Sequence, residues 1–418
     1  MFLVKKWVTG TAKSTRLTIS GATPNRFIAI WTKFRLSIRH YLHSTTTSHL
    51  IKMGICGLFL FFLFPSESSA IWFNATHDYR KQITISSTMV STTNHTNFPV
   101  FISFTNNDFK TIPNGGNMAS GSGEFVVTSS DGVTVLPHEI ETYTATTGAL
   151  EAWVNVPTLS STANTVLYIY YGGPGPGTAT NQNKTGTWNS NFVGVYHFGS
   201  PTTLSVRDSS AGAHHVVTNN GVVAGTGKMG GGAGSGTGDY LDLGVVADHN
   251  FLDATNYTIT AWFNTTSIAT TQGIVQKFNS GVAGQWTHQT INSSVRFVRN
   301  VTPFSGEGAT DLSSDTWYYS ASRYDGTNVI LRYNATQDFT GAFGNVPTNT
   351  TTRTLLGSQE SSSVPNNPFL GVYDEIRISN VARTDGWLTT EYNNQNSPST
   401  YITLGTTEES IRRRIIEE

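Results

Sequence analysis

The sequence contains little sulfur and little charge. Its 418 residues include a single cysteine, Cys56, and only 13% of the residues are charged. Because Cys56 lies in an N-terminal segment that we expect to be cleaved, the mature chain would have no thiol. This excludes disulfide bonds, cysteine metal sites and cysteine nucleophiles. A chain of this length can bury a core without such cross-links.

Acidic residues are absent from the first 52 positions, which carry nine Lys and Arg residues. Removing these nine bases and Glu67 leaves 17 bases and 26 acids in residues 71–418, a net charge of −9. An acidic body repels the phosphate backbone of nucleic acid. We therefore expect no nucleic-acid partner.

A long apolar run is also lacking, because the stretch from Gly54 to Pro65 is shorter than the ~20 residues of a membrane-spanning helix. Small residues, Ser68, Ser69 and Ala70, follow it. A basic start, a short apolar run and a small-residue site are typical of a signal peptide. The pattern predicts a secreted or cell-surface protein, with the membrane involved only through this peptide. Either Met1 or Met53 is the start.

Glycine and aromatic residues are abundant: the sequence has 40 Gly and 11% aromatics. Short alternating stretches bounded by Asn, Gly and Ser clusters predict strands, and no long helical period appears. The fold class expected is all-β, with two β-sandwich domains. The expected organisation is a basic leader and signal peptide, a β-rich domain, a Gly/Pro linker, a jelly roll and a tail, at residues 1–70, 71–173, 174–187, 188–406 and 407–418.

The clearest strands alternate apolar and polar residues. In the first domain we expect strands at residues 82–86, 100–105, 124–128, 150–157 and 165–171. In the jelly roll we expect strands at 257–264, 273–277, 294–298, 316–322 and 328–334. The first of these places Tyr257, Ile259 and Ala261 on one face. One short helix is expected near Asp385, whose carboxylate would be its N-cap.

Several segments carry a resemblance to known families. VGVYHFG (193–199), YTITAWFN (257–264), DTWYYSASRYDG (315–326) and FLGVYDEIRISNVART (369–384) together resemble a laminin-G-like, concanavalin A-type jelly roll. WFNATHDYRKQITI (72–85), EAWVNVPTL (151–159) and LYIYYGG (167–173) resemble an uncharacterised secreted bacterial domain that precedes such jelly rolls. The second resemblance implies an extracytoplasmic setting and no activity.

Glycoside hydrolysis requires two carboxylates that flank the scissile bond. Asp374 and Glu375 are adjacent and would point to opposite faces of a strand, with Arg377 as a partner for Glu375. Glu139 and Glu141 share a strand face in the first domain but lack a third acid, and we interpret them as surface charge. The expectation is that the protein is not an enzyme.

Calcium is the only cofactor that the sequence suggests. Asp374 and Asp208, in VRDSS, could supply hard oxygen ligands to a structural Ca²⁺ ion, and the resemblance to the jelly roll pairs them. The alternative is that Asp208 caps a turn through nearby backbone and Asp374 accepts a hydrogen bond from a buried amide.

Trp286 differs from the other strand tryptophans. Trp153, Trp262 and Trp317 fall within strand patterns and are expected in the core. Trp286 lies among small and polar residues, in GVAGQWTHQ, which suggests an exposed indole that stacks on a sugar. His288 and Gln289 would supply hydrogen bonds beside it.

The glycines at 225, 227 and 230 match GxGxxG formally. No βαβ unit surrounds them, so we interpret them as a mobile turn rather than a nucleotide site.

The hypothesis that follows is a non-catalytic binding protein that recognises a glycan or an extracellular protein through its jelly roll. A structural spacer of a surface assembly is the alternative. A laminarinase-like glycoside hydrolase is the third. The oligomeric state stays open.

Overall fold

The protein is described by a computed structural model that covers residues 72–74, 76–119, 121–173, 182–251, 255–279, 285–299, 305–343 and 351–411, with Val4–Lys5 and Ser14–Thr15. The predicted signal segment and most of the predicted linker lie outside the described residues. The chain divides into two compact units, Met1–Ser69 and Ala70–Glu418. In the first, strands β1 (Val4–Lys5) and β2 (Ser14–Thr15) pair antiparallel.

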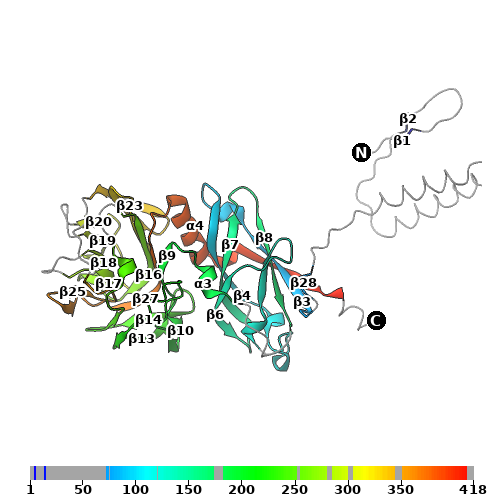
Figure 1. The fold of residues 1–418 in the computed structure, drawn as a ribbon, viewed down its shortest axis with the longest axis horizontal. Coiled ribbons are helices and arrows are strands. Elements are labelled where there is room, and N and C mark those ends of the chain that lie inside the picture. Colours follow the sequence, from blue (N-terminus) through cyan, green and yellow to red (C-terminus); the bar gives the residue numbers. More distant parts are fainter. Residues whose placement is uncertain are drawn as a thin grey trace, which may run out of the picture. The chain divides into compact units, whose positions relative to one another are not determined.

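The unit Ala70–Glu418 is all-β, as predicted, and contains two sandwiches (Figure 1). Among its described residues, no helix has the length and apolar character needed to cross a membrane. The first sandwich has sheets ordered β4-β7-β6 and β28-β3-β8-β5. Its strands are β3 (Tyr79–Ile85), β4 (His95–Thr105), β5 (Val126–Ser129), β6 (His138–Thr144), β7 (Ala149–Leu159), β8 (Thr165–Tyr171) and β28 (Ile402–Glu409).

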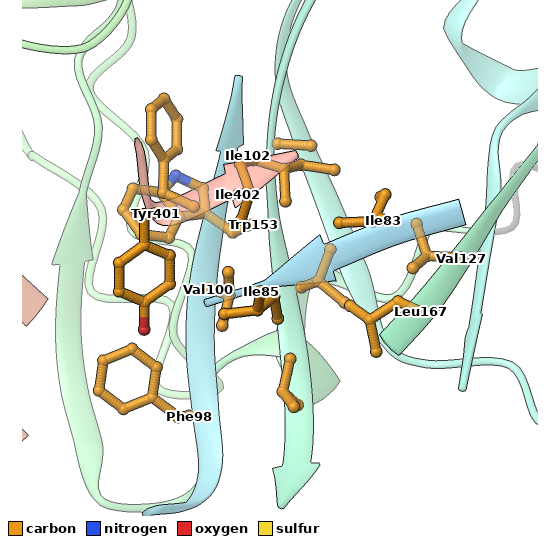
Figure 2. Packing of buried hydrophobic residues seen from close by; sticks show 14 of the residues in the cluster. Ile83, Ile85, Phe98, Val100, Ile102, Val127, Trp153, Leu167, Tyr401 and Ile402 are labelled. Atoms are coloured by element: carbon orange, nitrogen blue, oxygen red, sulfur yellow. The ribbon is translucent and has the colours of Figure 1, made fainter. Parts of the chain in front are cut away.

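Alternation builds the core of the first sandwich. Ile83 and Ile85 on β3 lie on the same face as Leu167 on β8, and all three are buried. They pack toward Phe98 and Val100 of β4, on the opposing sheet (Figure 2). Burial on this scale contributes about 25 cal/mol per Å² of apolar surface removed from water.

The last described strand, β28, belongs to the first sandwich. β28 pairs antiparallel with β3, with Ile402 opposite Ile85 and Glu409 opposite Tyr79. Tyr401 and Ile402 are buried in the core of the first sandwich (Figure 2). The predicted boundary at residue 406 and the predicted tail from 407 are therefore wrong for this strand. The chain reaches the edge of β3 with Tyr401 and Ile402 only after it has formed the whole second sandwich. Local sequence does not reveal this return.

The second sandwich is formed by two larger sheets. The seven-stranded sheet has the order β12-β15-β24-β17-β18-β19-β20. Its strands are β12 (Thr218–Asn220), β15 (Tyr240–Asp242), β17 (Gln272–Lys277), β18 (Trp286–Ile291), β19 (Ser294–Arg299), β20 (Ser305–Glu307) and β24 (Leu355–Leu356).

The eight-stranded sheet has the order β13-β14-β27-β16-β21-β22-β23, and β9 pairs with β27 beside this path. Its strands are β9 (Phe192–Tyr196), β13 (Val223–Thr226), β14 (Gly231–Ser235), β16 (Tyr257–Thr265), β21 (Trp317–Tyr324), β22 (Asn328–Tyr333), β23 (Thr336–Ala342) and β27 (Gly371–Ser379). Two small hairpins join β10 (Gly199–Ser200) to β11 (Thr203–Leu204) and β25 (Gln359–Ser361) to β26 (Val364–Asn366).

The predicted alternation along β16 is confirmed. Tyr257, Ile259 and Ala261 belong to the core between the two large sheets. Trp262, on the other face of β16, belongs instead to the core that continues into the first sandwich. The eight-stranded sheet is therefore buried on both faces in this region.

The described residues of this unit also form three α-helices, α3 (Lys184–Thr187), α4 (Asp385–Asn396) and α5 (Pro398–Tyr401), and short 3-10 helices. The predicted helix near Asp385 is α4, but its N-cap is Thr384, whose hydroxyl accepts a hydrogen bond from the amide of Trp387. Asp385 instead pairs with Arg323 and Arg332, at 2.9 and 3.1 Å.

If β28 completes the first sandwich, shortening Ile402 should destabilise the whole unit. Ile402→Ala is expected to lower the free energy of unfolding by about 2–4 kcal/mol, because it leaves a cavity in the core. Denaturant unfolding checks this. Thr403→Ala, at the exposed neighbouring position, is the matched control and should change stability by less than about 0.5 kcal/mol. Equal stability of both variants would contradict the role assigned to β28.

Candidate functional site

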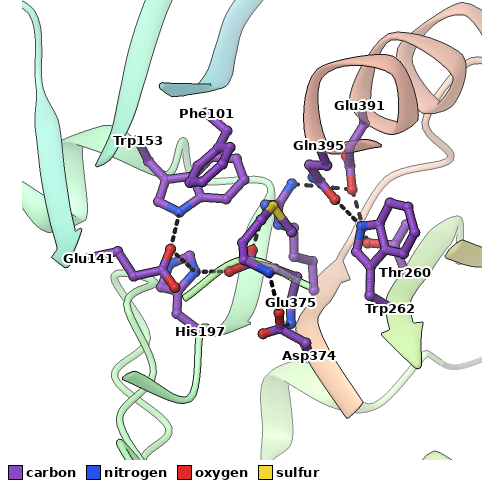
Figure 3. A network of polar contacts seen from close by, with 12 residues as sticks. Phe101, Glu141, Trp153, His197, Thr260, Trp262, Asp374, Glu375, Glu391 and Gln395 are labelled. Carbon is purple, nitrogen blue, oxygen red and sulfur yellow. Dashed lines mark hydrogen bonds and ion pairs between the residues drawn. The ribbon is translucent and has the colours of Figure 1, made fainter. Parts of the chain in front are cut away.

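A cluster of buried ionisable groups lies where the two sandwiches meet. Glu139 and Glu141 come from β6 of the first sandwich, and Glu375 comes from β27 of the second. His197, which directly follows β9, lies among them (Figure 3). Its ring nitrogens lie 2.6 Å from Glu375, 3.6 Å from Glu139 and 3.8 Å from Glu141.

A β-bulge lies at Glu141. The pairing of β6 with β7 shifts register between Ile140 and Thr142, so Glu141 is the extra residue on β6. Glu139 and Glu141 both contact His197. Our interpretation of these acids as surface charge is wrong, because their side chains are only 4% and 2% exposed.

A second bulge directs Glu375. On β27 the register against β16 shifts so that Asp374 lies opposite Trp262 and Arg377 opposite Thr260. Glu375 has a φ of +48°, in the left-handed region. A residue other than glycine, asparagine or aspartate is uncommon in this region and costs of order 1–3 kcal/mol. Strain of this kind persists only where surrounding contacts compensate for it, and Glu375 contacts both His197 and Arg377.

Arg377 is the second cation of the cluster. It pairs with Glu375 at 2.7 Å, as the sequence predicted, and with Glu391 of α4 at 3.2 Å. Its guanidinium also lies over the rings of Trp153 and Trp188, at 4.3 and 5.0 Å from their centroids. Cation–π contacts between desolvated groups are worth about 2 kcal/mol or more. Arg377 therefore links both sandwiches and α4.

The indoles of Trp153 and Trp188 also donate hydrogen bonds to the acids. The indole nitrogen of Trp153 donates to Glu141 at 2.9 Å, and that of Trp188 donates to Glu139 at 2.8 Å. The imidazole of His197 is stacked on Trp153, with centroids 5.7 Å apart. The predicted core position of Trp153 is confirmed, and this indole has in addition a polar role at its edge.

Burial and mutual charge separate the pKa values of these groups. Burial by itself would lower the pKa of His197, but the charges of Glu375 and Glu139 outweigh it and raise this pKa well above its ordinary value. Burial, reinforced by the charge of Glu375, raises the pKa of Glu141. Burial would also raise the pKa of Glu139, but His197, Ser209 and Trp188 lower it to about 2.

Asp374 holds the glycine-rich turn. Its Oδ2 accepts hydrogen bonds from the backbone amides of Lys228 and Met229, at 2.8 and 3.0 Å. A Cβ at Gly227 would lie 2.6 Å from the same oxygen, so this position requires glycine. The carboxylate of Asp374 therefore holds the turn at residues 227–230 in place. We had expected this turn to be mobile.

Asp208 ties a loop to β9. Its carboxylate accepts hydrogen bonds from the backbone amides of Val195, Ser210 and His214, each at 2.8 Å. Both predicted calcium ligands thus satisfy buried amides, which is the alternative raised from the sequence. Among the described residues, the group with metal-ligand geometry is Glu141, His197 and Glu375, and it includes neither aspartate. Calcium binding at Asp208 and Asp374 stays a prediction.

The predicted sugar-binding residues divide between two faces of β18. Trp286 is fully buried in the core, where its indole nitrogen donates to the carbonyl of His249. His288 is also buried and contacts Ser320 and Ser322 of β21. The expectation of an exposed indole at Trp286 is therefore wrong: strand alternation places Trp286 and His288 between the sheets. Gln289 lies on the opposite, outer face.

The outer face of the seven-stranded sheet carries polar side chains. Leu241, Val275 and His288 face the core, so their strand neighbours Tyr240, Asp242, Gln276 and Gln289 face outward. Other contributors are Arg353, which bridges Asp242 at 2.6 Å and Glu360 at 2.8 Å, and Gln359, which contacts Gln289. Apart from Gln289, the sequence did not single out these residues, because they become neighbours only through strand pairing.

Comparison with known proteins agrees with this architecture. Residues 235–389 match the concanavalin A-like lectin/glucanases superfamily, and residues 123–207 match a domain of unknown function (DUF2341). No curated protein matches the chain.

Three solved structures illustrate the likeness. Domain 4 of an extracellular arabinanase from Geobacillus stearothermophilus, in complex with arabinotriose, is 17% identical over 49% of this chain and 98% of that domain, with a TM-score of 0.38. A sialidase carbohydrate-binding domain of Ruminococcus gnavus, bound to α2,3-sialyllactose, is 15% identical over 42% of this chain and 98% of that domain, with a TM-score of 0.33. The binding domain of botulinum neurotoxin serotype D is 11% identical over 51% of this chain and 53% of that chain, with a TM-score of 0.39.

Identities and TM-scores this low carry no functional information about this chain. The family matches agree with the sheets described above and with both resemblances noted in the sequence. Residues 235–389 are therefore similar to concanavalin A-like lectin/glucanase domains, and residues 123–207 are similar to a family of domains of unknown function.

Proposed function

We propose that the protein is a secreted, non-catalytic binding protein that recognises a carbohydrate on the outer face of its seven-stranded sheet. The fold family supports a lectin-like role in general terms. The chemistry of one sheet face, and the partial exposure of Tyr240 and Arg353 on it, support the more specific proposal. The basic leader and the apolar run before residue 71 support export.

The two large sheets differ in what covers their outer faces. The outer face of the eight-stranded sheet is occupied by α4. Trp262 donates to Gln395 at 2.5 Å, Arg332 donates to Thr389, and Thr260 donates to Glu391. Strands β17 to β20 lie on the side of this unit away from β3 and β8 (Figure 1). On the outer face of the seven-stranded sheet, the hairpin of β25 and β26 contacts Gln276 and Gln289, whereas Tyr240 and Arg353 are half-buried.

The outer face of the seven-stranded sheet has the groups that bind sugars. Amides, a guanidinium and carboxylates can donate to and accept from hydroxyl groups. Tyr240 offers a half-buried aromatic ring, 5.8 Å from the guanidinium of Arg353. Aromatic rings pack on the apolar faces of ligands while their polar ends form hydrogen bonds.

The observation that carries the proposal is the side-chain amide of Gln276. Its oxygen accepts from the amide of Glu360 at 3.1 Å, but its buried nitrogen has no hydrogen-bond partner in the described structure. A buried donor left without an acceptor costs about 1–3 kcal/mol. Gln276 is fully buried, so a ligand hydroxyl would satisfy this nitrogen only after the segment of Glu360 had moved aside.

Hydrolysis is not favoured by this geometry. Glu139 and Glu141, the acids weighed for catalysis, are enclosed between the sandwiches. A polysaccharide could reach them only if the sandwiches separated. We therefore propose binding without turnover.

A printed array of plant, bacterial and animal oligosaccharides tests the proposal. The protein should bind a defined subset of glycans, with competition by the free sugar. Tyr240→Ala should weaken that binding about tenfold, which corresponds to about 1.4 kcal/mol. The matched control is Tyr168→Ala, another half-buried tyrosine beside an arginine but on the first sandwich.

A second pair of variants tests the polar part of the face. Gln289→Ala should also weaken glycan binding, whereas Gln337→Ala on the exposed strand β23 should not. Uniform silence across the array, or equal binding by all four variants, would contradict recognition by this face.

The structural-spacer role is the second candidate, and the buried cluster favours it. A spacer must keep its two ends at a fixed distance and orientation. Arg377 could contribute to this because it connects both sandwiches with α4. Arg377→Met is expected to lower the free energy of unfolding by about 3–5 kcal/mol, because it leaves Glu375 and Glu391 buried without their cation. Denaturant unfolding measures this loss. Arg207→Met, at an exposed position, is the control, and equal stability of the two variants would exclude Arg377 as the link.

A further inference from the structure

Three side chains direct potential metal ligands to one point between the sandwiches. One ligand atom each from Glu141, His197 and Glu375 lies within 4.8 Å of the others. Nδ1 of His197 lies 2.6 Å from Oε1 of Glu375 and 3.8 Å from Oε2 of Glu141. In Figure 3 the three side chains converge from two separate sandwiches.

The donor types indicate which metal would fit. One imidazole nitrogen with carboxylate oxygens is a ligand set that zinc accepts, with bonds of about 2.0–2.2 Å. Tetrahedral bonds of this length separate neighbouring ligand atoms by about 3.4 Å. The distances of 2.6 and 3.8 Å lie on either side of this value, so shifts of less than 1 Å would be enough. Calcium would need six to eight oxygen ligands, which this cluster does not offer.

One acid in the cluster has an unused oxygen. Oε1 of Glu141 is buried and has no hydrogen-bond partner among the described residues, and the side chain is 2% exposed. With both of its oxygens, Glu141 would bring the donors to four, the number that structural zinc sites use. A buried carboxylate oxygen without a donor is otherwise costly.

Groups around the three residues already orient them as outer-shell partners do at metal sites. Trp153 donates to Oε2 of Glu141, and Arg377 donates to Oε2 of Glu375, the oxygen that does not face His197. Such second contacts commonly fix the orientation of metal ligands.

The cluster also has more acids than bases. The carboxyl groups of Glu139, Glu141, Asp374 and Glu375 outnumber the cations beside them, which are His197, Arg377 and the exposed Lys184, 3.3 Å from Glu139. Either protons or a cation must balance the excess, because isolated buried charges are not tolerated.

We propose that Glu141, His197 and Glu375 bind a structural zinc ion that cross-links the two sandwiches. The ion takes the place of the proton on Nδ1 of His197. Because the ligands come from β6, from the end of β9 and from β27, the ion can be bound only when the sandwiches are packed together. Metal binding then adds directly to the stability of the folded unit.

Elemental analysis of the full chain, purified without metal-affinity resin, tests the proposal. We expect about one zinc per chain. X-ray absorption at the zinc edge should show nitrogen and oxygen neighbours that include one imidazole. After removal by a strong chelator the melting temperature should fall, and added Zn²⁺ should restore it. A metal-free protein whose melting temperature responds to neither chelator nor Zn²⁺ overturns the proposal and leaves protons to balance the acids.

Variants test the ligand assignment. Glu141→Gln keeps the shape of the side chain but is expected to weaken zinc binding at least tenfold and to abolish the thermal response to Zn²⁺. Glu124→Gln, another buried glutamate of the first sandwich, is the matched control and should keep both. Undiminished zinc binding by Glu141→Gln overturns the assignment. If Glu141→Gln does not fold, the absorption spectrum of the wild-type chain decides, since a spectrum without imidazole contradicts it equally.

Discussion

Carboxylates buried between two sheets require partners, and this requirement organises the unit formed by residues 70–418. Glu139 and Glu141 of the first sandwich find theirs in His197, which belongs to the second. Glu375 and Glu391 share Arg377, which lies against indoles of the first sandwich and of the segment leading into β9. Separating the sandwiches would expose each group to water but would also break every pairing at once. The interface is therefore specific in its register, because a shift of one residue would bury unpaired charge.

The path of the chain reinforces this electrostatic link. After the second sandwich is complete, the chain continues through α4 and α5 and returns as β28 to the edge of β3. The first sandwich is thus composed of segments from both ends of the unit, and its core includes Tyr401 and Ile402. A division into two consecutive domains describes the family matches but not the folded unit. Helix α4 covers the outer face of the eight-stranded sheet, and the hairpin of β25 and β26 contacts the outer face of the seven-stranded sheet.

The backbone is irregular at two acids of the interface, Glu141 and Glu375. The bulge on β6 places Glu141 outside the regular pairing with β7. The left-handed backbone at Glu375 has the same effect on β27. A bulge leaves no clear trace in a single sequence, since neither HEIETY nor YDEIRIS contains the glycine that often marks one. The sequence reasoning therefore found the pairing of Glu375 with Arg377 but missed His197 and misjudged Glu139 and Glu141 as surface charge.

Local patterns in the sequence determined the all-β class, most strands, helix α4 and the position of the jelly roll, because alternation and turn residues act over a few neighbours. Strand β8 was predicted with its bounds as observed, and the inward face of β16 was predicted residue by residue. Tertiary structure alone decided that Trp286 is buried, that Tyr240 and Gln276 share an outer face, and that β28 joins the first sandwich. Each of these outcomes depends on which strands become neighbours. Pairing between residues that are hundreds of positions apart is set by the packing of whole sheets, which no local pattern encodes.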